Sequence, residues 1–133
     1  MDTGQLNLII GCMFSGKSTE MIRLIKRYKQ LNKYNLLLIN NSKDNRYGES
    51  VISSHDKVQI NCHSLTNLYD IKKTEYYQNC NVIFIEEGQF FTDLYDFCIE
   101  AADIDNKILY VAGLDGDYQK KEFGQMCKLV PHA

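Results

Sequence analysis

The sequence predicts an α/β fold in which a mainly parallel sheet carries helices on both faces. Short and almost wholly apolar segments recur along the chain, as is typical of strands that are buried on both sides. Segments with apolar residues at helical spacing lie between them. Glycine-containing segments follow several of the predicted strands, and ligands bind such sheets at the carboxyl ends of the strands.

Length and composition predict one soluble domain. The chain has 133 residues, enough for a single hydrophobic core. Its 44% hydrophobic and 24% charged residues exclude a disordered tail and a coiled coil. The sequence contains no apolar run long enough to cross a membrane and does not open with a signal peptide. We therefore expect a cytoplasmic protein without membrane contact.

Charge and cysteine content narrow the expected ligands. Fifteen basic and 17 acidic residues give a net charge of −2, which disfavours a nucleic-acid partner but not a mononucleotide. The five cysteines form no C-x-x-C pair, so we expect reduced thiols and no zinc site. They are Cys12, Cys62, Cys80, Cys98 and Cys127.

The first half of the chain predicts three strands and one long helix. Gln5–Ile10 is the first strand, and Lys17–Leu31 has the apolar spacing of a helix. The apolar run Leu36–Ile39 predicts a buried strand. The polar segment Asn40–Asp56 that follows is typical of a loop, and the alternation in Val58–Cys62 predicts a short strand.

The second half repeats this alternation. Leu65–Ile71 has the pattern of a helix, and the apolar run Asn81–Ile85 predicts another buried strand. Thr92–Ala102 fits a helix with Thr92 as its N-cap. Lys107–Ala112 predicts the last strand, and a glycine-bearing loop follows it as far as residue 124.

The strongest functional signal is an unbroken G-x-x-x-x-G-K-S pattern between the first predicted strand and the first helix. Glycine lets backbone N–H groups approach phosphates closely, and the helix N-terminus adds partial positive charge. The lysine reaches the β- and γ-phosphates, and the serine hydroxyl can bind Mg²⁺. The alternative, a chance glycine-rich turn, is disfavoured because the motif lies between a strand and a helix. The predicted triphosphate-binding residues are Gly11, Cys12, Met13, Phe14, Ser15, Gly16, Lys17 and Ser18.

A pair of acidic residues forms the second signal. Glu86 and Glu87 directly follow the apolar strand predicted at Asn81–Ile85. In P-loop proteins an acid at the end of a neighbouring strand orients Mg²⁺. Because consecutive side chains point to different sides, one glutamate could serve the metal and the other the substrate. The alternative is two solvated charges at a strand end, and the neighbouring P-loop pattern favours the functional interpretation.

Three weaker signals stay open. Arg46, in the polar loop, could stabilise charge on a transferring phosphoryl group, or the loop could simply be solvated. His55 and Asp56 fit a surface pair better than a catalytic dyad, since no Ser or Cys nucleophile pattern accompanies them. Tyr118 and Phe123 either stack on a nucleobase or fill the core.

These motifs are collinear with those of a known family. The chain resembles the cellular and poxviral class of thymidine kinases, deoxynucleoside kinases whose fold is related to the RecA-like ATPases. The matching blocks are MFSGKST at 13–19, K-D-x-R-Y at 43–47, S-H-D at 54–56, EGQFF at 87–91 and GLDGDYQKKEFG at 113–124, with LVP at 129–131.

The resemblance implies transfer of the ATP γ-phosphoryl group to the 5′-hydroxyl of thymidine, with Mg²⁺ essential. It implies that Glu87 is the base, and that Glu86 and Ser18 are the residues associated with Mg²⁺. It also implies a homo-oligomer such as a tetramer. The further residues implied to border the ATP phosphates are Asp44, Asn45, Arg46, Gly88 and Gln89. Those implied to line the thymidine pocket are Met13, Phe90, Leu114, Tyr118 and Phe123.

The sequence also departs from the family pattern. Glu86 replaces an aspartate, which moves the carboxylate outward by about 1.5 Å. Cys12 replaces the usual proline, and Tyr118 replaces a phenylalanine. The family continues beyond the LVP stretch into a small domain with two C-x-x-C zinc pairs and a lasso loop over the thymine, both absent from these residues. The alternative function is therefore a truncated, catalytically impaired nucleotide-binding module. A third alternative, a generic P-loop ATPase or GTPase, is disfavoured because N-K-x-D is absent.

Overall fold

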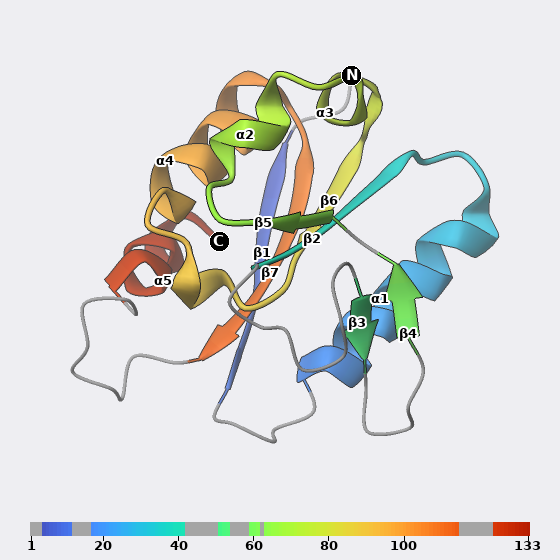
Figure 1. Ribbon diagram of the computed structural model, residues 1–133, viewed down its shortest axis with the longest axis horizontal. Helices are drawn as coiled ribbons and strands as arrows, with labels where there is room; N and C mark the ends of the chain where they lie inside the picture. Colours follow the sequence, from blue (N-terminus) through green and yellow to red (C-terminus); the bar gives the residue numbers. More distant parts are fainter. Residues whose placement is uncertain (1–3, 12–16, 42–50, 54–58, 62, 115–123) are drawn as a thin grey trace.

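A five-stranded parallel sheet forms the centre of the protein, which confirms the predicted fold class (Figure 1). The computed structural model describes residues 4–11, 17–41, 51–53, 59–61, 63–114 and 124–133. The strand order is β1-β7-β6-β2-β5, and every neighbouring pair in this sheet is parallel. In that order the strands are Gln5–Gly11, Ile108–Leu114, Val82–Ile85, Leu36–Asn41 and His63–Leu65.

Helices cover both faces of this sheet (Figure 1). Among the helices that the structure describes, α1 (Lys17–Leu31) packs against one face and the others pack against the opposite face. The latter are α2 (Tyr69–Lys72), α3 (Glu75–Asn79), α4 (Leu94–Ile99) and α5 (Gly124–Leu129). Helix α4 continues as a π-helix over Glu100–Ile104, and 3-10 turns span Gly88–Phe90 and Val130–His132.

Strand β6 shows how the two faces divide the core. Its residues are all buried, with Ile83 and Ile85 in the cluster under α4 and α5, and Val82 and Phe84 in the cluster under α1. This alternation follows from the two-residue period of a strand. Burial on both faces explains why the segment is continuously apolar.

A short antiparallel pair lies apart from the main sheet. It consists of β3 (Val51–Ser53) and β4 (Gln59–Asn61), with Ile52 opposite Ile60. Within the described residues, no helix is both long enough and apolar enough to cross a bilayer.

Several predicted boundaries are wrong. The predicted loop Asn40–Asp56 contains the end of β2 and all of β3. The predicted helix Leu65–Ile71 begins only at Tyr69, because Leu65 pairs with Asn41 as the last residue of β5. In these places sheet pairing overrides the local helical or polar pattern.

The other predicted elements compared are the helices and one strand. Helix α4 begins at Leu94, and its N-cap is Asp93 rather than Thr92. Helices α3 and α5 were not predicted. The helix predicted at Lys17–Leu31 is confirmed with the same bounds. The predicted strand Val58–Cys62 is observed as Gln59–Asn61.

Candidate functional site

The carboxyl ends of β1, β7 and β6 lie side by side and define the candidate site. Strand β7 is the central strand of the three, pairing Leu114 with Gly11 of β1 and Val111 with Ile85 of β6. Neighbouring strands lie about 4.8 Å apart. The two signals singled out in the sequence, the phosphate-loop pattern and the acidic pair, therefore follow strands separated only by β7.

Part of the phosphate-loop motif lies in the described structure. Gly11 is the last residue of β1, and Lys17 and Ser18 are the first two residues of α1. The strand–motif–helix order that the sequence predicts is thus observed. Residues 12–16, which include Cys12, Met13, Phe14, Ser15 and Gly16, lie outside the described residues.

Glu86 and Glu87 lie in different environments immediately after β6. The Glu86 backbone N–H donates to the Ile39 carbonyl at 2.8 Å, and Glu86 is only 5% exposed. Glu87 is half-buried and has a left-handed backbone, with φ 57° and ψ 46°. A residue other than glycine adopts this backbone conformation at a cost of about 1–2 kcal/mol, and such strain concentrates at functional sites.

The turn after Glu87 packs closely on β7. An ideal Cβ built on Gly88 would lie 2.7 Å from Val111 Cγ1, so any larger residue there would require the Val111 side chain to shift. The Phe90 N–H donates to the Glu87 carbonyl at 3.2 Å, and the Phe91 N–H donates to the Gly88 carbonyl at 3.1 Å. These contacts fix the direction in which the chain leaves β6.

Gln89 belongs to the same turn and contacts the half-buried acid. Its Nε2 donates to Glu87 Oε2 at 2.6 Å, and the residue is only 1% exposed. A hydrogen bond to an ionised acceptor is roughly twice as strong as one between neutral groups.

Two buried asparagines near this edge were missed by sequence reasoning. Asn40 and Asn41 end β2 and are 3% and 0% exposed. They are the first two residues of the polar segment that follows the apolar run Leu36–Ile39, and that polar segment predicted a loop. Their position could have identified them as candidate site residues, since polar residues directly after a buried parallel strand lie at the ligand-binding edge of the sheet.

The other predicted site residues divide between described and undescribed segments. Phe90 is half-buried in the 3-10 turn, and Leu114 is the last residue of β7. The remaining predicted residues lie outside the described residues: Asp44, Asn45, Arg46, His55, Asp56, Tyr118 and Phe123.

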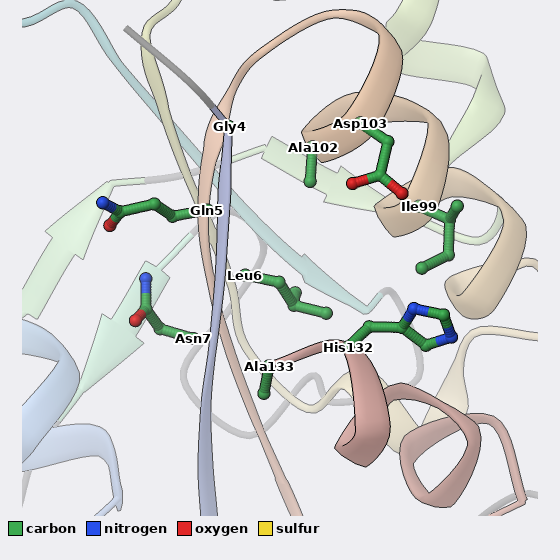
Figure 2. A pocket seen from close by; sticks show the side chains of 9 residues that line it. All are labelled: Gly4, Gln5, Leu6, Asn7, Ile99, Ala102, Asp103, His132 and Ala133. Atoms are coloured by element: carbon green, nitrogen blue, oxygen red, sulfur yellow. The ribbon is translucent and has the colours of Figure 1, made fainter.

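A cavity of about 300 Å³ lies away from this site (Figure 2). Its lining includes Gly4 just before β1, Leu6 near the start of β1, Asp103 from the π-helix, and His132. Gly4 and Leu6 lie toward the amino end of β1, whereas the candidate site lies at Gly11. The cavity is therefore not part of the candidate site.

Comparison with known proteins gives one family. A family model described as thymidine kinase matches residues 4–133. The chain is 42% identical over 133 residues to the thymidine kinase of Oryza sativa subsp. japonica, and 45% identical over 130 residues to that of Myxoma virus (strain Uriarra). These alignments cover 98% of the chain, but 49% of the rice protein and 70% of the viral one. An Arabidopsis thaliana protein, thymidine kinase a, is 40% identical, with 56% of its length covered. The chain therefore spans about half of the plant relatives' length.

Proposed function

Because the chain belongs to the thymidine kinase family, we propose that it transfers the γ-phosphoryl group of ATP to the 5′-hydroxyl of thymidine. The products are ADP and thymidine monophosphate, a precursor for DNA synthesis. The observation that carries the proposal is the family match over residues 4–133. The side-by-side arrangement of the phosphate-loop strand, β7 and the acid-bearing strand supports it.

The proposed phosphate site is the segment from Gly11 to Ser18. Backbone N–H groups of this segment and the start of α1 bind the phosphate oxygens. The Lys17 ammonium neutralises charge on the β- and γ-phosphates. Further contacts to the phosphates are proposed for Asp44, Asn45, Arg46, Gly88 and Gln89, by resemblance to the family.

Glu87 is the proposed base. The 5′-hydroxyl oxygen of thymidine forms a bond to the γ-phosphorus, and the bond from that phosphorus to the bridging oxygen of ADP breaks. The hydroxyl proton passes to the Glu87 carboxylate. A half-buried carboxylate fits this role, because it is reachable by substrate and held in a fixed turn.

Glu86 and Ser18 are the residues proposed to hold Mg²⁺. Carboxylate oxygen is a preferred Mg²⁺ ligand, and the Glu86 side chain is buried at the same sheet edge as the phosphate motif. Among the described residues, no group of three or more His, Cys, Asp or Glu is placed to bind a metal. A magnesium ion held mainly by phosphates and water does not need such a group. When bound, Mg²⁺ neutralises charge on the transferring phosphate.

The thymidine pocket is proposed to include Met13, Phe90, Leu114, Tyr118 and Phe123. Phe90 comes from the turn after β6, and Leu114 is the last residue of β7. Aromatic and aliphatic side chains suit a nucleobase, since they stack on its faces and exclude water.

The direct test combines binding and turnover. Purified chain is incubated with labelled ATP, thymidine and Mg²⁺, and the formation of thymidine monophosphate is followed. ATP affinity is measured separately by calorimetry for Lys17→Ala and for Lys26→Ala, an exposed lysine on the same helix. Lys17→Ala should weaken ATP binding tenfold or more, about 1.4 kcal/mol. Unchanged affinity in Lys17→Ala contradicts the phosphate-site assignment.

The same assay separates the proposed kinase from its alternative. ATP binding without thymidine monophosphate would favour a nucleotide-binding module lacking kinase activity. The family resemblance also leads us to propose a homo-oligomer, which light scattering after size-exclusion chromatography would test.

A further inference from the structure

We propose that Gln89 is a positioning residue that holds the carboxylate of Glu87 in place for proton transfer. This proposal rests on the proposed function, in which Glu87 accepts the 5′-hydroxyl proton. It gives Gln89 a role through its neighbour, in addition to the phosphate contact that the family resemblance implies.

The first support is the contact between the two side chains. Gln89 Nε2 donates to Glu87 Oε2 at 2.6 Å. Gln89 is 1% exposed, whereas Glu87 is half-buried. A buried amide is restricted by its surroundings, so it can orient a more exposed carboxylate rather than follow it.

The second support is the backbone between them. Glu87 has left-handed dihedral angles, and the 3-10 turn Gly88–Phe90 follows it directly. The Phe90 N–H bonds back to the Glu87 carbonyl. The turn therefore returns Gln89 toward Glu87, and main chain and side chain together restrict the acid.

The third support is the space in which Gln89 lies. An ideal Cβ on Gly113 of β7 would lie 2.8 Å from Gln89 Oε1 and 3.0 Å from Met126 Sδ. Met126 is on α5 and is 1% exposed. The absence of a side chain at Gly113 thus leaves room for the Gln89 amide, and Met126 closes the same space from the helix side.

These contacts link two separate segments, β7 and α5, to the proposed base through Gln89. Strand β7 and helix α5 border the Gln89 side chain, and Gln89 donates a hydrogen bond to Glu87. A displacement of about 1 Å in a reacting group can reduce turnover by about a hundredfold. A residue that fixes the Glu87 carboxylate should therefore affect kcat more than substrate binding.

The first test is kinetic and uses Gln89→Met, which keeps the length of the side chain and removes the donor. We expect kcat to fall by at least about tenfold, while the KM for thymidine changes less than about twofold. Gln78→Met, at an exposed glutamine of α3, is the matched control. An unchanged kcat in folded Gln89→Met overturns the proposal. So does a rise in the KM for ATP without a fall in kcat, which would indicate only a direct nucleotide contact.

Gly113→Ala provides a second variant in case Gln89→Met does not fold. It keeps both polar side chains, and its added Cβ would displace the Gln89 amide and also press on the Met126 side chain, which lie 2.8 and 3.0 Å from that position. Its kcat should also fall, again with little change in the KM for thymidine. An unchanged kcat in folded Gly113→Ala argues against positioning by Gln89.

A nuclear magnetic resonance measurement tests the contact independently of turnover. The side-chain amide signal of Gln89 should shift, and its exchange with water should accelerate, in Glu87→Ala. The control Glu75→Ala, at an exposed position of α3, should leave the signal unchanged. A signal that does not move in Glu87→Ala overturns the proposal. Absence of thymidine monophosphate from the unmodified chain would instead reject the proposed function, so the two failures are distinguishable.

Discussion

The carboxylate of Asp93 accepts a hydrogen bond from the backbone N–H of Leu68, with Oδ1 3.2 Å from the nitrogen. Its second oxygen accepts from the Tyr69 N–H at 3.1 Å. Asp93 is the N-cap residue of α4, yet it makes no side-chain capping bond to that helix. It instead satisfies N–H groups at the start of α2, which joins two helices on the same face of the sheet.

This arrangement predicts that Asp93→Ala destabilises the protein by about 1–2 kcal/mol, because two N–H groups lose their acceptor. Thr92→Ala, one position earlier and exposed, should change stability by less than about 0.5 kcal/mol. Urea unfolding followed by circular dichroism measures both. Equal losses in the two variants would contradict the stabilising role of the Asp93 carboxylate at the start of α2.

Glu100 should make stability depend on pH. Hydrogen bonds from Lys72 and then from Tyr69 lower the pKa of the Glu100 carboxyl from its ordinary value of 4.5. Folding therefore favours the ionised form. The resulting stabilisation is present above pH 4.5 and is lost as the pH falls through the lower, folded-state pKa.

The test of this pH dependence is Glu100→Gln. The variant should be less stable than the unmodified chain at pH 7, and the difference should shrink toward pH 3. Urea unfolding at several pH values measures the difference, with Glu75→Gln at an exposed position as the control. A difference that stays constant with pH would show that the Glu100 charge does not contribute.

Glu87→Gln should reduce kcat while ATP binding survives. The substitution keeps the shape of the side chain but removes the group that accepts the proton. Initial rates with saturating ATP and thymidine, together with calorimetric ATP affinity, separate these effects. A near-normal kcat would place the base elsewhere.

Glu86 should control the requirement for Mg²⁺. Glu86→Gln should raise the Mg²⁺ concentration needed for half-maximal activity, because a carboxylate binds Mg²⁺ more strongly than an amide does. Glu86→Asp restores the aspartate of the resembled family. Increased Mg²⁺-dependent turnover in Glu86→Asp would show that the longer side chain is a handicap. If both variants keep the original Mg²⁺ dependence, Glu86 does not serve the metal.

The parts of the fold that local patterning determines were predictable from the sequence. Helix α1 spans Lys17–Leu31 as predicted, since its apolar residues repeat over four turns. Strand β6 was also predicted, because burial on both faces makes its sequence continuously apolar. These two elements also allowed the phosphate-loop pattern to be placed before α1 and the acidic pair directly after β6.

Long-range contacts determine what was missed. Leu65 belongs to β5 because it pairs with Asn41 of β2, and no local pattern records that pairing. The N-cap of α4 was assigned to Thr92 because the sequence does not show that α2 is nearby. Similarly, the contact of Gln89 with Gly113 joins segments that are distant in the sequence. Motif reasoning identified both residues as part of family blocks but not as neighbours.

The pairing of β1 with β7 has a consequence for how the protein is made. β1 lies at one edge of the sheet, and its described strand partner is β7, about 100 residues later in the chain. Ribosomes add about 5–20 residues per second, so β1 waits roughly 5–20 seconds for this partner. During synthesis the strand leading into the phosphate motif therefore emerges well before β7, as a mostly apolar segment without its strand partner. Until β7 is made, the unpaired N–H and C=O groups of this strand can pair with another chain, so the nascent protein is prone to aggregate.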